Sequence, residues 1–152
     1  MLYLLDTNIV VFMVRGLKVY ANPNGRQRER HRVARRIFEQ AHKCKVAGDT
    51  VALSAITVAE LEFGAWGRDD YQTEIDATRR AVAPFGLLAF DPGDCAAQYG
   101  KIRHALESVG KGIGSLDTLI AAHALAVGAI LVTNDTTEFS KVPGLTCEDW
   151  SS

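Results

Sequence analysis

Short apolar runs alternate with longer stretches of helical periodicity along this chain. Runs of strand length are expected at residues 2–5, 51–54, 86–91, 129–132 and, as a last short strand, within 144–150. Helices are expected at residues 7–14, 31–46, 55–65, 69–83, 96–109 and 116–127. This order predicts an α/β fold in which a central parallel β-sheet is flanked by helices on both faces. The run at 129–132 supports that prediction, because it lacks the polar alternation of a half-exposed strand.

One segment breaks the alternation. Residues 15–30 have no apolar periodicity and contain Asn-Pro-Asn-Gly at 22–25, which is a strong turn signal. We therefore expect a basic loop insertion at 15–31 within a single domain that spans 1–152. Residues 15–36 hold eight of the 17 Lys and Arg residues and only one acid, Glu29. The formal net charge of −1 thus combines a basic segment with an acidic remainder.

The composition is that of an ordinary soluble globular protein, with 47% hydrophobic and 23% charged residues. The three cysteines at 44, 95 and 147 are far apart and form no C-x-x-C motif, so we expect reduced thiols in a cytoplasmic protein. The apolar N-terminus lacks a basic leader and is not expected to be a signal peptide. The longest nearly apolar stretch, 119–132, is shorter than the roughly 18 residues that a membrane span requires.

Acidic residues recur where the chain passes between strands and helices. Asp6 ends the first strand, and Asp135 follows the strand at 129–132. Glu60 lies in the opening turns of the helix after the second strand, and Asp117 lies at the start of the helix that leads to 129–132. In open parallel sheets, functional groups collect at the carboxyl ends of the strands. The predicted topology therefore brings all four carboxylates towards one edge of the sheet.

Each acid, taken alone, has a structural explanation. Asp6 and Asp135 have the residue type of a helix cap or an Asx turn, and Thr57 to Glu60 matches a capping box. Asp117 after Ser115 is an ordinary helix start. Four such caps near one edge are less expected than any single one, because clustered carboxylates repel one another unless a cation lies between them. An all-oxygen site of this kind suits Mg²⁺ or Mn²⁺ and not Zn²⁺.

Four segments, LLDTNI, LSAITVAELEFGA, GIGSLDTLIAAHAL and LVTNDTTEF followed by VPGL, occur in this order along nearly the whole chain. They resemble the successive signatures of PIN-domain ribonucleases, specifically the VapC-type toxins of bacterial toxin–antitoxin modules. The resemblance implies a metal-dependent endoribonuclease that is inhibited by a cognate antitoxin, and it also implies a homodimer. The acidic quartet of the family falls on the four residues already singled out, which are Asp6, Glu60, Asp117 and Asp135.

The resemblance also suggests roles within the site. Asp6 and Asp117 are expected to be direct metal ligands, with Asp135 completing the site. Glu60 is expected either to ligate through water or to act as a general base. Thr133 and Asn134 match polar positions beside the last acid and are expected to position water or a ligand.

The basic segment is where this chain departs from the family, whose members usually cross here by a shorter and less basic connection. Three interpretations stay open: a solvated loop, an arm that contacts RNA phosphates, or a surface that binds the antitoxin. Arg26, Arg28 and Arg30 are the candidate contacts.

Two other classes of protein compete with the ribonuclease. A Mg²⁺-dependent phosphatase would require Asp-x-Asp at the first strand, where this chain has Asn8 as the third residue. A PIN scaffold that binds RNA or a protein partner without catalysis is the stronger alternative, although it gives no reason to keep four mutually repelling acids. His123, which lies among alanines in the middle of a helix, is expected to be a core residue with its hydrogen bonds satisfied.

Overall fold

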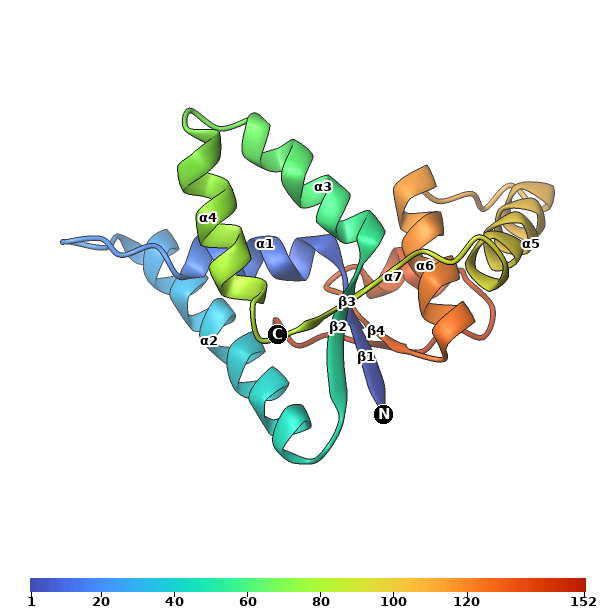
Figure 1. The fold of residues 1–152 in the computed structure, drawn as a ribbon, viewed down its shortest axis with the longest axis horizontal. Coiled ribbons are helices and arrows are strands. Elements are labelled where there is room, and N and C mark those ends of the chain that lie inside the picture. The colour runs from blue at the N-terminus through green and yellow to red at the C-terminus, as the bar shows by residue number, and fades with distance from the viewer.

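The computed structural model describes residues 1–152 and contains one sheet of five parallel strands in the order β3-β2-β1-β4-β5 (Figure 1). The strands are β1 (Leu2–Leu5), β2 (Thr50–Ser54), β3 (Gly86–Leu88), β4 (Ile130–Val132) and β5 (Cys147–Glu148). The helices are α1 (Thr7–Gly16), α2 (Gly25–Val46), α3 (Ala55–Trp66), α4 (Tyr71–Val82), α5 (Asp94–Ser108), α6 (Ser115–Val127) and α7 (Thr136–Phe139). The predicted α/β class with an all-parallel sheet is confirmed.

Two hydrophobic clusters cover the two faces of the sheet. Tyr3 and Leu5 of β1 pack against α1, α2 and α4, whereas Leu4, which points to the other face, packs against α5 and α6. This follows from the period of two along a strand. Figure 1 shows α1, α2 and α4 on one side of the strands and α5 and α6 on the other, with α3 rising from the end of β2. None of the helices is both long and apolar enough to cross a membrane.

The second helix begins earlier than the sequence pattern predicted. α2 starts at Gly25 and not at residue 31, so the basic loop expected at 15–31 is wrong over most of its length, and only 17–24 connect the two helices. A capping box explains the early start: the Asn24 side chain accepts from the Gln27 N–H (2.8 Å), and the Gln27 side chain accepts from the Asn24 N–H (2.9 Å). The first turns of α2 are exposed on nearly all sides, which is why they lack apolar periodicity.

A glycine allows α1 and α2 to cross closely. Gly16 ends α1, and a Cβ atom on it would overlap both the Ala34 side chain and the Arg30 carbonyl group of α2. His31 lies at the same crossing, with Nδ1 3.2 Å from the Gly16 carbonyl oxygen. The crossing places the end of α1 directly against the first turns of α2.

We expect Gly16→Ala to lower the free energy of unfolding by about 1–3 kcal/mol, because overpacking at a tight contact forces the two helices apart. Urea denaturation followed by circular dichroism measures this change. Gly100→Ala is the matched control, because Gly100 lies inside α5 with no atom near the added methyl group. The control should be neutral or stabilising by up to about 1 kcal/mol. Equal stability changes for the two variants would contradict this account of the crossing.

Candidate active site

Asp6 lies at the carboxyl end of β1 and is almost fully buried, with 3% of its surface exposed. One carboxylate oxygen accepts a hydrogen bond from the Thr7 N–H (2.8 Å), as a cap of α1 should. The other oxygen accepts from the Thr133 hydroxyl group (2.9 Å). Asp6 is therefore a helix cap and, at the same time, a carboxylate held in one orientation by two donors.

Glu60 is positioned by Thr7 and not by a capping box. α3 begins at Ala55 with the Ser54 side chain as its cap, so Thr57 lies inside the helix and the capping box that offered a structural explanation of Glu60 does not form. The Thr7 hydroxyl group donates to Glu60 Oε1 (2.7 Å) and lies 3.2 Å from the Thr57 hydroxyl oxygen. Thr7 thus connects the start of α1 to the second turn of α3, a role that sequence reasoning missed.

Thr133 joins two of the acids. Its hydroxyl group donates to Asp6 and accepts from the Asp135 N–H (3.0 Å). Asp135 follows β4 and caps α7, where its side chain accepts from the Glu138 N–H (3.2 Å). Thr133 therefore orients Asp6, whereas its expected role in positioning water or a ligand stays a prediction. Asn134 is exposed and makes no hydrogen bond to the acids, so its role stays a prediction.

The pKa values indicate that the four carboxylates act on one another. Burial is the main cause that raises the pKa of Asp6 to about 6, and the charges of Asp117 and Glu60 add to it against the lowering effect of its two hydrogen bonds. Burial also raises the pKa of Asp117, together with the charges of Glu60 and Asp135. The sequence-predicted quartet is therefore brought together. Glu138 is a further acid that sequence reasoning missed, and its charge also raises the pKa of Asp117.

The chemistry of this cluster fits a divalent cation. No Lys or Arg side chain forms an ion pair with any of the four acids. All of the donors are oxygen atoms, as Mg²⁺ and Mn²⁺ prefer. As the side chains stand, no group of three His, Cys, Asp or Glu residues is arranged to hold one ion. The fit therefore rests on charge and donor type and not on a preformed cage.

Comparison with known proteins gives the family. The model of the PIN domain matches residues 3–145, which is nearly the whole chain. The chain is a PIN-domain protein of the VapC type. It is 30% identical over 151 residues to "Ribonuclease VapC1" of Haemophilus influenzae (strain R2866), covering 99% of both chains. It is 32% identical over 149 residues to "tRNA(fMet)-specific endonuclease VapC" of Shigella flexneri, covering 98% of both.

Solved structures agree with this PIN-domain assignment. The chain superposes on VapBC2 from Rickettsia felis bound to a DNA fragment from its promoter, with a TM-score of 0.82 and 29% identity over 99% of each chain. It superposes on VapBC-1 from nontypeable Haemophilus influenzae with a TM-score of 0.75 and 29% identity over 100% of each chain. The predicted family is confirmed.

Two hollows of this PIN domain lie along α1, and the lining of the first includes Glu60 of the acidic cluster. The first lies between α1, α3 and α4, and its lining includes Thr7 and Glu60 at one end and Arg15 and Arg68 at the other. The second lies on the α2 side, and its lining runs from Asn134 to Arg15 and Arg30. A ligand in the first hollow can therefore reach from Glu60 along α1 to Arg15 and Arg68.

His123 is a core residue, as predicted, but only one of its ring nitrogens is satisfied. It is fully buried in α6, and Nδ1 lies 2.7 Å from the Ser54 hydroxyl oxygen, whereas Nε2 has no hydrogen-bond partner. The ring contacts Phe90 edge-on. Burial lowers the pKa of His123 and favours the neutral ring. Because Ser54 caps α3 and Asp117 lies on α6, this bond connects the two helices that carry Glu60 and Asp117.

Proposed function

We propose that this protein is a metal-dependent endoribonuclease, and that its acidic cluster is the catalytic centre. The observation that carries the proposal is the cluster itself, in which Asp6, Glu60, Asp117 and Asp135 from four separate segments meet without a cationic partner. The names of the relatives support ribonuclease activity. Mutual repulsion of this kind destabilises a protein unless a bound cation offsets it, so a purely structural role is a poor explanation.

Hydrogen bonds to Thr7 and Thr133 support the roles proposed for Glu60 and Asp6. Asp6, held by Thr7 and Thr133, and Asp117 would be direct ligands of Mg²⁺ or Mn²⁺, and Asp135 would complete the site. When bound, such an ion neutralises charge on the scissile phosphate and makes an attacking water more acidic. Glu60, held by Thr7, would ligate through water or accept a proton from that water. In-line attack on phosphorus would then cleave the RNA chain without a covalent enzyme intermediate.

The proposed partners come from the relatives. The two solved structures described above are those of VapBC proteins, so we propose that a cognate antitoxin binds and inhibits this protein. The relative from Shigella flexneri is named for tRNA(fMet), which makes initiator transfer RNA the first substrate to test. The homodimer stays a prediction.

Incubation of the purified protein with initiator transfer RNA and with single-stranded RNA, in Mg²⁺ or Mn²⁺, tests the proposed function. We expect cleavage at defined positions that EDTA abolishes and added Mn²⁺ restores. RNA binding without cleavage in any metal would favour the alternative, a catalytically silent PIN scaffold.

Thr7→Val should lower kcat by about 10- to 100-fold, which is the usual cost of removing a residue that orients a ligand or base. Valine keeps the shape of threonine and the backbone N–H that Asp6 accepts, but it releases Glu60. Steady-state kinetics on the cleaved RNA measures the effect. Thr7→Ser, which keeps the hydroxyl group, is the matched control and should retain most of the activity. Equal rates for the valine and serine variants would show that the bond to Glu60 is irrelevant.

A further inference from the structure

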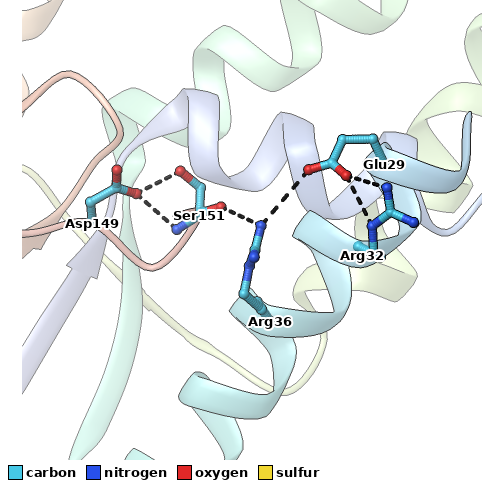
Figure 2. A network of polar contacts seen from close by, with 5 residues as sticks. All are labelled: Glu29, Arg32, Arg36, Asp149 and Ser151. Carbon is cyan, nitrogen blue, oxygen red and sulfur yellow. Dashed lines mark hydrogen bonds and ion pairs between the residues drawn. The ribbon is translucent and has the colours of Figure 1, made fainter. Parts of the chain in front are cut away.

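The basic residues of the segment at 15–36, together with Arg68 after α3, include two groups that differ in their partners. Members of the first group are occupied by internal partners: Arg32 pairs with Glu29, and Arg36 donates to the Ser151 carbonyl oxygen (3.0 Å), as Figure 2 shows. The Ser151 N–H and hydroxyl group in turn donate to Asp149, so this network fixes the C-terminal residues against α2. Arg32 is therefore paired within α2, and Arg36 links α2 to the C-terminal residues.

Members of the second group have no carboxylate partner. Arg15 at the end of α1 and Arg30 on α2 are exposed, and neither forms an ion pair. Arg68, in the turn after α3, is exposed and likewise forms no ion pair. An exposed arginine without a partner retains its full capacity to bind an anion, since its planar group carries five N–H donors.

These three arginines converge with Lys18 and Tyr20 on a hollow of about 270 Å³, which we call the basic cavity. No acidic residue lines it. Lys18 is the one lining residue with an ion pair, to Glu74 on α4 (3.3 Å). The lining comes from segments far apart in the sequence, and the close α1–α2 crossing at Gly16 is what brings Arg15 and Arg30 together. Three arginines without a counter-charge in one cavity, beside a lysine that is paired outside it, make a site for an anion.

The basic cavity adjoins the hollow between α1, α3 and α4 that contains Glu60. Arg15 and Arg68 line both the cavity and the first hollow, which contains Glu60, and Arg15 and Arg30 line both the cavity and the second hollow. Arg15 lies nine residues after Asp6 on α1, a separation of about 13 Å at a rise of 1.5 Å per residue. At about 3.4 Å per nucleotide of a stacked strand, that separation corresponds to about four nucleotides.

We propose that the basic cavity is a subsite for a backbone phosphate of the RNA, about four nucleotides from the cleaved bond. This inference rests on the proposed function, because it assigns a second contact on the same substrate. Arg15, Arg30 and Arg68 bind the phosphate, and Tyr20 offers an aromatic face for the neighbouring base. Tyr20 is the one apolar side chain of the lining, whereas a protein partner is usually anchored by several buried apolar side chains. RNA therefore fits the cavity better than an acidic protein segment does.

RNA affinity measured as a function of salt tests the subsite. A labelled single-stranded oligoribonucleotide of about 12 nucleotides, long enough to reach both sites, is the probe. Binding is followed by fluorescence anisotropy in the Asp6→Asn background, which prevents cleavage. The test variant replaces Arg15, Arg30 and Arg68 with alanine. The matched control replaces Lys43, Arg80 and Lys101, which form no ion pairs and do not line the cavity, and so removes the same charge.

We expect the test variant to bind about tenfold more weakly at low salt, because three exposed ion pairs to phosphate are lost. The slope of log K against log salt should become shallower by about 0.7, which is the value for one phosphate contact on a single strand. The control variant should show the same slope of log K against log salt as the Asp6→Asn protein. Equal slopes for the two triple variants would overturn the subsite, and so would tighter binding of a poly-glutamate peptide than of the RNA probe. Failure of the wild type to cleave RNA, with the slope difference intact, would instead overturn the proposed catalysis and leave the subsite standing.

Discussion

Asp6→Asn should lower the rate of RNA cleavage by at least about a thousandfold, because a carboxylate that holds the catalytic ion contributes several kcal/mol to stabilisation of the transition state. The fold should survive the change. Asparagine is a good helix cap, and its side-chain oxygen can still accept the hydrogen bond from the Thr7 N–H. Single-turnover cleavage of initiator transfer RNA with Mn²⁺ measures the loss.

Asp91→Asn is the matched control for this experiment. Asp91 also accepts a hydrogen bond from a backbone N–H at a helix start, that of Asp94, but it is exposed and lies outside the acidic cluster. The control removes the same charge in the same kind of position and should cleave at the wild-type rate. An equal loss of cleavage rate in both variants would mean that removing a negative charge lowers the rate wherever the charge lies. Full activity of Asp6→Asn would show that the catalytic site is elsewhere or that a contaminating nuclease was measured.

The same substitution should make the protein more stable at neutral pH, by up to about 3 kcal/mol in the free energy of unfolding. The pKa of Asp6 is about 6 in the folded protein against an ordinary value of 3.8. Below pH about 4, both the folded and the unfolded chain carry the proton, and Asp6 imposes no penalty. Between the two pKa values the unfolded chain loses its proton first, so stability falls as the pH rises. Above pH 6 the full penalty is present.

Urea denaturation of wild type and Asp6→Asn at pH 4 and pH 7.5, in the presence of EDTA, measures this difference. The difference in free energy of unfolding, variant minus wild type, should be larger at pH 7.5 than at pH 4. Saturating Mn²⁺ at pH 7.5 should make this difference in unfolding free energy smaller again, because it stabilises the wild type, which keeps the metal ligand. A ligand that binds only the folded state stabilises it by about 2.7 kcal/mol at 100 times its Kd. A difference in unfolding free energy that does not change with pH would mean that Asp6 is not held in an unfavourable charged state.

The fold and the acidic quartet could be predicted from sequence because both depend on local patterns. The alternation of short apolar runs and helical periodicity fixes the parallel sheet, and a parallel sheet places Asp6 and Asp135 at one edge. The start of α2 was missed because periodicity detects only a buried face, whereas that turn is exposed and its signal lies in Asn24 and Gln27. A search for capping boxes with Asn and Gln would have found it.

Contacts between distant residues could not be predicted in this way. Thr7 is read from sequence as an ordinary residue of a helix start, and nothing local indicates that its hydroxyl group reaches Glu60, 53 positions away. The basic cavity is similar, since Arg68 lies far from the segment that supplies Arg15 and Arg30. Such contacts depend on how the helices are placed on the sheet, which periodicity does not specify.

Cleavage of RNA by metal-free protein during titration with Mn²⁺, in water enriched in oxygen-18, tests the central claim most directly. Mass spectrometry of the new RNA ends is the readout. The acidic cluster predicts no cleavage before metal is added and a cleavage rate that saturates with Mn²⁺. Each cleavage should leave a phosphate with one heavy oxygen atom on one new end and a hydroxyl group without heavy oxygen on the other, because water is the attacking group. Cleavage that persists in EDTA, or ends that carry a cyclic phosphate without heavy oxygen, would contradict a metal-dependent hydrolysis at these four carboxylates.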